Sequence, residues 1–200
     1  MIYKFTNDLP DDVIIKGDLA IDTETMGLNL KRDRLCLLQM NNGKHTYLIK
    51  FQDKEYNALN LKKLLSDPDS VKIMHYARFD MAAIKQYLGV SLQNVFCTKI
   101  ASKIARTYTD NHGLRTICAE LLSVGISKQQ QSSYWGAKNL SKEQEDYAAN
   151  DVLYLHQIKD KLTGILKNEG RFELVQKICD FLPTRVELDL RGWEDDIFAH

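Results

Sequence analysis

The stretch Leu19-Ala-Ile-Asp-Thr-Glu-Thr25 places a short apolar run directly before two carboxylates that are two positions apart. The run follows Gly17, and Gly27 ends the segment, which is typical of a buried strand. Because alternate strand residues point to the same face, we expect Asp22 and Glu24 to project together. Such a pair repels unless cations compensate it, and hard divalent ions such as Mg²⁺ or Mn²⁺ prefer oxygen ligands. A strand end with two solvated acids is the alternative for this segment alone.

A third acid lies where a strand is expected to lead into a helix, in the segment IMHYARFDMAAI at 73–84. Apolar residues at helical spacing predict a helix from residue 79, which puts Asp80 in its first turn. The positive end of the helix dipole favours an anion there, and a plain N-terminal acid is the alternative. For His75, a hydrogen-bonded histidine near the core is preferred to a metal ligand.

A fourth acid lies in the helical segment EQEDYAANDVLYLHQIKDKL at 143–162. Ser141 followed by Gln144 matches a capping box. Tyr147 and Asp151 are four residues apart and therefore share a helix face. Such a tyrosine can hold a water beside a metal bound by the aspartate. The alternative is that Tyr147 packs and Asp151 is a solvated charge.

Taken together and in this order, the three motifs resemble the DEDD superfamily of 3′→5′ exonucleases, over about residues 15 to 166. The tyrosine four residues before the last aspartate marks the DEDDy branch, to which ribonuclease D belongs. The stretches at 110–137 and 187–200, DNHGLRTICAELLSVGISKQQQSSYWGA and ELDLRGWEDDIFAH, resemble the NanoRNase C group of alphaproteobacteria. Tyr76 departs from ribonuclease D, which more often carries asparagine there.

The resemblance implies a site with two divalent metal ions, Mg²⁺ or Mn²⁺. Asp22, Glu24 and Asp151 would hold one ion. Asp22 would bridge to a second ion, and Asp80 would complete that second position directly or through water. Tyr147 would orient or deprotonate the attacking water, with orientation the safer assignment because a free tyrosine has a pKa near 10. The product would be a nucleoside 5′-monophosphate.

The segment after Glu24 lies beside the scissile nucleotide in related exonucleases, and Leu28, or else Met26, is expected to wedge between the last two bases. The polar and aromatic run at 129–135 provides groups that stack on bases or reach phosphates. Packing of the loops, with Trp135 as an anchor, is the alternative. The predicted substrate contacts are Thr23, Met26, Gly27, Leu28, His75, Gln130, Ser132, Tyr134 and Trp135.

The charge balance favours small substrates. The 200 residues include 27 Lys and Arg and 27 Asp and Glu, whereas proteins that grip long nucleic acid usually carry a basic surplus. About thirty residues follow the catalytic helix, too few for the C-terminal helical domains of ribonuclease D. We expect an exoribonuclease acting on short oligoribonucleotides, with diribonucleotides favoured. The alternatives are a broader exonuclease on single- and double-stranded RNA and DNA, and a non-catalytic nucleic-acid-binding adaptor.

Other features predict a cytoplasmic enzyme. No stretch approaches the ~20 apolar residues of a membrane span, and the N-terminus does not resemble a signal peptide. The four cysteines, Cys36, Cys97, Cys118 and Cys179, form no C-x-x-C pair, so free thiols are expected.

The pattern of elements predicts a single α/β domain over 1–200: a ribonuclease H-like mixed β-sheet flanked by helices, with a catalytic core at about 15–166. Strands are expected near 13–16, 19–24, 35–40, 45–50 and 71–75, and helices near 56–66, 79–88, 98–107, 114–123, 142–167 and 170–181. The segment at 167–200 carries an apolar tail that must be buried. The NanoRNase C resemblance implies a homo-octamer, so docking on a neighbouring subunit is favoured over folding back. The tail's apolar residues are Leu188, Leu190, Trp193, Ile197 and Phe198.

Overall fold

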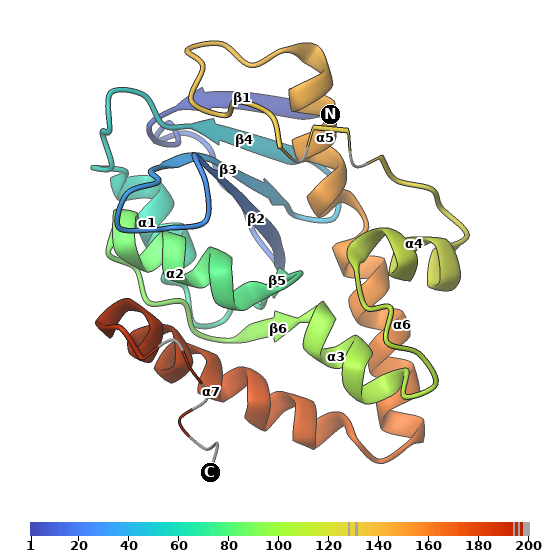
Figure 1. Cartoon of the computed structure of the whole chain (residues 1–200). Coiled ribbons are helices and arrows are strands. Elements are labelled where there is room, and N and C mark those ends of the chain that lie inside the picture. The colour runs from blue at the N-terminus through green and yellow to red at the C-terminus, as the bar shows by residue number, and fades with distance from the viewer. Residues whose placement is uncertain (128, 131, 194, 196, 198–200) are drawn as a thin grey trace.

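The computed structural model describes residues 1–127, 129–130, 132–193, 195 and 197. In this part of the chain, six strands form one sheet in the order β1-β4-β3-β2-β5-β6 (Figure 1). β2, β3 and β4 form an antiparallel meander, and β1, β5 and β6 each run parallel to the strand they join. The strands are β1 (Ile2–Thr6), β2 (Leu19–Thr25), β3 (Leu35–Asn41), β4 (Thr46–Lys50), β5 (Lys72–Met74) and β6 (Val95–Cys97).

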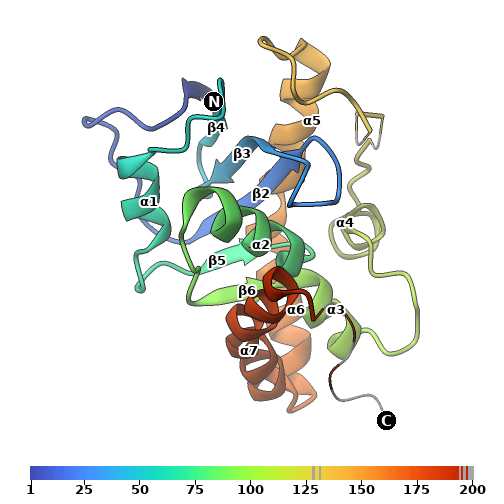
Figure 2. The same cartoon turned by 60° about the vertical axis from the view of Figure 1, so that its left-hand side comes forward.

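Helices cover both faces of this sheet (Figures 1 and 2). α5 packs on β2, β3 and β4, α6 on β5, and α2 on β2, β3 and β6. This confirms the predicted α/β fold with a mixed sheet flanked by helices. The helices are α1 (Leu59–Leu65), α2 (Ala77–Leu88), α3 (Thr98–Ala105), α4 (Leu114–Leu122), α5 (Lys142–Leu153), α6 (Leu155–Asn168) and α7 (Phe172–Arg191). No helix in the described ranges is long and apolar enough to cross a membrane.

Two short strands differ from the prediction. Residues 13–16 form no strand, although Ile15 is buried in the core. The N-terminal strand is instead β1, an edge strand that pairs only with β4 and whose side chains are partly exposed. β6 has three residues, too few for an alternating pattern to be visible.

The helical C-terminal half also differs in its boundaries. The helix expected over 142–167 is two helices that meet at Tyr154, one on the meander and the other on β5. α7 continues through Pro183 to Arg191, well beyond the predicted end at 181. Leu190 therefore lies on α7 and packs against the core of its own chain. For this part of the tail, the structure agrees with the alternative in which the tail folds back on its own domain.

The feature that positions the site is the unequal length of β2 and β5. Their pairing consists of Leu19 with Lys72 and Ala20 with Ile73, whereas β2 stays paired with β3 as far as Thr25. Beyond Ala20, the edge of β2 that faces β5 is thus released from the sheet. The first turn of α2, which follows β5, lies at this opening and contacts β2.

Candidate active site

Three of the four predicted carboxylates meet at the end of β2. Oxygen atoms of Asp22, Glu24 and Asp151 all lie within 4.8 Å of one another. Strand alternation turns Asp22 and Glu24 toward the face covered by α5. α5 supplies Asp151 in its last turn, and the predicted capping box of Ser141 and Gln144 defines the start of this helix.

The fourth carboxylate, Asp80, is held by the residue between the first two. The N–H of Thr23 donates to Asp80 Oδ1 at 3.1 Å, and the Thr23 hydroxyl donates to the same oxygen at 2.6 Å. This N–H is free to bond to a side chain because β2 pairs with β5 only at Leu19 and Ala20. Both bonds fall on one oxygen, so Asp80 Oδ2 carries neither of them. Thr23 is itself buried, and it positions Asp80 rather than presenting a free hydroxyl to substrate.

Gln39 is a member of the site that the sequence analysis missed. Its side-chain amide donates to Asp22 Oδ2 at 2.7 Å from the directly opposite position on β3. Gln39 is fully buried in a strand that is otherwise mostly apolar. A buried amide within this apolar strand was the available signal, but its partner became visible only with the strand register.

The four carboxylates and Tyr147 line one cavity of about 320 Å³. The same cavity is also lined by two cations and one hydroxyl that the sequence analysis did not assign to the site, namely Lys99, Arg115 and Ser127. Lys99 lies in the first turn of α3, and Arg115 lies in the first turn of α4. The lining of the cavity therefore combines acidic and basic side chains.

Burial and mutual repulsion dominate the electrostatics of this cavity. Burial, followed by the charges of Asp80, Asp151 and Glu24, raises the pKa of Asp22 well above its usual range. Burial and then the neighbouring Asp151 and Asp80 raise the pKa of Glu24 to about 9.

The pKa values of Asp80 and Asp151 are raised less, because hydrogen bonds oppose the effect of burial. Burial raises the pKa of Asp80 to about 7 against the bonds from Thr23. Burial likewise raises the pKa of Asp151 to about 7 against the hydrogen bond from Tyr147. Four carboxylates that resist joint ionisation, with only oxygen donors, fit a site for hard divalent cations, whose charge would remove the repulsion.

Tyr147 makes both a packing contact and a polar contact at the site. Its ring lies 6.1 Å from that of Trp135, centroid to centroid, and its hydroxyl bonds to Asp151. Burial and then the charges of Asp151, Glu24 and Asp22 raise the pKa of Tyr147 above its usual value. The hydroxyl is therefore well placed to orient a neighbouring group and, without a cation, poorly suited to lose its proton.

Tyr76, the departure from the ribonuclease D pattern, has a left-handed backbone at the start of α2, with φ 64° and ψ 42°. This conformation costs most residues about 1–2 kcal/mol and is easier for asparagine. The Tyr76 side chain is 52% exposed and lines the cavity, and Lys99 Nζ lies 4.2 Å from its ring centroid.

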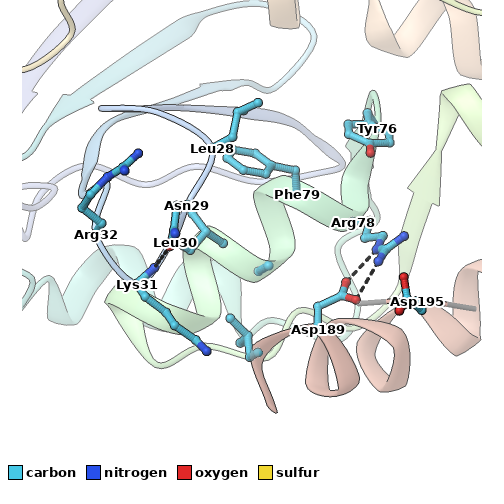
Figure 3. A pocket seen from close by; sticks show the side chains of 12 residues that line it. Leu28, Asn29, Leu30, Lys31, Arg32, Tyr76, Arg78, Phe79, Asp189 and Asp195 are labelled. Atoms are coloured by element: carbon cyan, nitrogen blue, oxygen red, sulfur yellow. Dashed lines mark hydrogen bonds and ion pairs between the residues drawn. The ribbon is translucent and has the colours of Figure 1, made fainter. Parts of the chain in front are cut away.

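The three predicted substrate contacts after Glu24, namely Met26, Gly27 and Leu28, have different surroundings in the structure. Gly27 is required because a Cβ there would collide with the Asp33 carboxylate, and Met26 lies against Gly136. Leu28 is 84% exposed and lines a second cavity of about 820 Å³ (Figure 3). Tyr76 and Phe79 line both cavities, so the second one adjoins the carboxylates.

The polar and aromatic run at 129–135 contributes no described residue to the lining of the carboxylate cavity. Gln131 lies outside the described residues, Gln130 is half-buried and Ser132 is exposed. Tyr134 is 65% exposed, but Trp135 is only 2% exposed. Trp135 packs in a small core with β3 and β4, and Lys50 Nζ donates to its carbonyl at 2.5 Å. The prediction of a stacking role for Trp135 disagrees with this burial, which fits the alternative of an anchor.

Comparison with known proteins agrees with this geometry. A family model described as 3′-5′ exonuclease matches residues 4–167. Ribonuclease D of Granulibacter bethesdensis is 30% identical over 159 residues, which cover 80% of this chain and 40% of that protein. The chain spans less than half the length of the ribonuclease D relatives that it matches.

Solved structures match over the whole chain. Brucella melitensis NrnC bound to pGG is 51% identical with a TM-score of 0.94, covering 100% of this chain and 98% of that chain. The same protein with bound Mg²⁺ is 50% identical with a TM-score of 0.93 and the same coverage. The resemblance to ribonuclease D-like enzymes and to NanoRNase C is thereby confirmed. The chain belongs to the 3′-5′ exonuclease family.

Proposed function

We propose that this chain is a metal-dependent 3′→5′ exoribonuclease that hydrolyses short oligoribonucleotides, diribonucleotides above all, to nucleoside 5′-monophosphates. The observation that carries the proposal is the convergence of four carboxylates and Tyr147 in one cavity. An adaptor that only binds nucleic acid has no need of such a costly cluster, since buried like charges destabilise the fold.

Preference for short substrates is supported by size and charge. The cavity of about 320 Å³ is at the small end of ligand sites. The chain has no net positive charge to hold a long phosphate backbone. The similar Brucella melitensis NrnC structure contains pGG, a short ligand. Lys99 and Arg115 lie where they would neutralise a phosphate of a short substrate.

In the proposed mechanism, Asp22, Glu24 and Asp151 would hold one Mg²⁺ or Mn²⁺ ion, and Asp22 and Asp80 would hold a second. Bound ions of this type activate water and stabilise a leaving oxygen. Thr23 and Gln39 fix the orientation of Asp80 and Asp22 through the bonds described above. Tyr147 orients the attacking water through its hydroxyl beside Asp151.

Leu28 remains our proposed wedge between the two bases. It is apolar, 84% exposed and located at the cavity that adjoins the carboxylates, with Phe79 between the two sites. An exposed leucine of this kind gains apolar contact only when a ligand covers it. We also propose assembly into a homo-octamer, in which the exposed Trp193 and Ile197 contact a neighbour. Phe198 lies outside the described residues.

The direct test is hydrolysis of 5′-labelled RNA and DNA of two to about twenty nucleotides with Mg²⁺ or Mn²⁺, followed by product size. We expect the fastest turnover on diribonucleotides and release of 5′-monophosphates. Asp22→Ala and Asp151→Ala should abolish turnover while the circular dichroism spectrum stays that of the wild type. Binding without cleavage by the wild type would indicate the adaptor, and similar rates on long RNA and DNA would indicate the broader exonuclease.

A further inference from the structure

His75 lines the carboxylate cavity and has a defined hydrogen-bond partner on its inner side. Its Nδ1 lies 2.9 Å from the hydroxyl oxygen of Thr98, the first residue of α3. The Thr98 hydroxyl in turn donates to the carbonyl oxygen of Met74 at 3.2 Å. Thr98 is fully buried, so water does not compete for either bond.

These two contacts favour one tautomer of His75. Both are hydrogen bonds at the same time only if the Thr98 hydroxyl donates its single proton to the Met74 carbonyl, because that oxygen cannot donate. Thr98 can then only accept from the ring, and Nδ1 of His75 carries the proton. In a neutral imidazole the other nitrogen is an acceptor, so Nε2 presents a lone pair.

The ring also stays uncharged. Burial, and then the nearby Lys99, lower the pKa of His75 to about 3. A neutral ring with an accepting Nε2 is a poor partner for phosphate oxygens, which also only accept. Its complement is a hydroxyl or N–H donor on the substrate.

We propose that Nε2 of His75 accepts a hydrogen bond from a ribose 2′-hydroxyl of the bound substrate and thereby makes the site selective for RNA over DNA. The inference rests on the proposed function, since it concerns the substrate of the same cavity. The 2′-hydroxyl is a donor present on every ribonucleotide, so one fixed acceptor serves all base sequences. Thr98 is the positioning residue, because it fixes which ring nitrogen holds the proton.

The test compares kcat/KM for a diribonucleotide and the matching 2′-deoxy dinucleotide in wild type, His75→Phe, Thr98→Val and Thr98→Ser. One neutral hydrogen bond is worth about 1 kcal/mol and up to several when a buried group is left unpaired, so we expect a wild-type preference of roughly 10- to 100-fold for the ribonucleotide. His75→Phe keeps a ring and should lose most of this preference.

The Thr98 variants separate the tautomer from the mere presence of the ring. Thr98→Val removes the group that accepts from Nδ1 and should lower the preference although His75 remains. Thr98→Ser retains the hydroxyl and should keep the preference. A 2′-fluoro dinucleotide, which has no donor, should behave as the deoxy substrate with the wild type.

Each alternative has a distinct result. An equal loss on both sugars in His75→Phe would overturn the inference and assign His75 to metal binding or structure. A changed preference among bases with an unchanged sugar preference would assign a base N–H as the donor and would also overturn it. Failure of the wild type to cleave either dinucleotide would overturn the proposed function itself.

Discussion

At the scale of single residues, Tyr147 joins the packing of the domain to the chemistry of the site. Its ring contacts Trp135, and its hydroxyl bonds to Asp151. Because the two contacts use different atoms, they can be separated by one substitution. The raised pKa of the hydroxyl favours orientation of water over removal of its proton.

Tyr147→Phe removes only the hydroxyl, so we expect kcat to fall by about 10²-fold while the thermal midpoint changes little. The ring contact with Trp135 is retained. Steady-state kinetics on a diribonucleotide and a thermal melt of the same samples measure the two effects. A drop in stability with an unaltered kcat would make Tyr147 a packing residue only.

The residues of the site differ in how far sequence alone could predict them. Asp22 and Glu24 follow from the period of a strand, and Asp80 from its place in a first helical turn. The hydrogen bonds from Thr23 to Asp80 could not be predicted, because they depend on where β5 stops pairing with β2. Gln39 and Arg115 reach the site only through strand register and the placement of α4.

At the scale of elements, α7 is tied to α2, the helix that carries Asp80. Asp189 near the end of α7 accepts two bonds from Arg78, at 2.6 and 2.7 Å (Figure 3). It accepts further bonds from Arg185. Burial acts to raise the pKa of Asp189, but the bonds from both arginines outweigh it, and the pKa lies below its usual value. α7 thus supports the first turn of α2 through residues that lie outside the carboxylate cavity.

Asp189→Asn should lower the free energy of unfolding by about 1–2 kcal/mol, since a forked arginine pair is stronger than an ordinary surface pair. Chemical denaturation measures this directly. Glu187→Gln, which weakens the more exposed contacts with Lys85 and Arg191, is the matched control and should lower the stability less than Asp189→Asn does. Equal effects of the two substitutions would argue against a special role for the Asp189 network.

Sequence patterns predicted elements where one face is buried and failed where context decides. β2, β3 and β4 were found because each contains a continuous apolar run, and β3 is buried along its full length. β6 and the edge strand β1 are specified by pairing with a neighbour rather than by their own pattern. The boundary between α5 and α6 at Tyr154 could not be predicted, because no glycine or proline marks it. The end of α7 could not be predicted because this helix continues through Pro183.

At the scale of the whole molecule, the carboxylate cavity couples folding to pH and to metal. The pKa of each of its acids is raised by burial, with Asp80 and Asp151 at about 7 and Glu24 at about 9. Between about pH 4 and 9 these four acids therefore bind more protons in the folded, metal-free chain than in the unfolded chain. This contribution to stability is complete below about pH 4 and is lost as the pH rises through the folded-state values.

We therefore expect the metal-free protein in EDTA to melt at a lower temperature at pH 8.5 than at pH 6, and Mg²⁺ or Mn²⁺ to reverse the loss. An ion at about 100 times its Kd adds roughly 2.7 kcal/mol, which corresponds to about 5–10 °C for a chain of this size. The stabilisation by metal should be smaller at pH 6, where protons compete for the same oxygens.

Asp22→Asn separates the contribution of this site from that of other acids, because it removes one charge of the cluster at constant size. This variant should melt higher than the wild type at pH 8.5 in EDTA and gain less from metal. Identical pH profiles for Asp22→Asn and wild type would contradict the assignment of the pH dependence to this cavity.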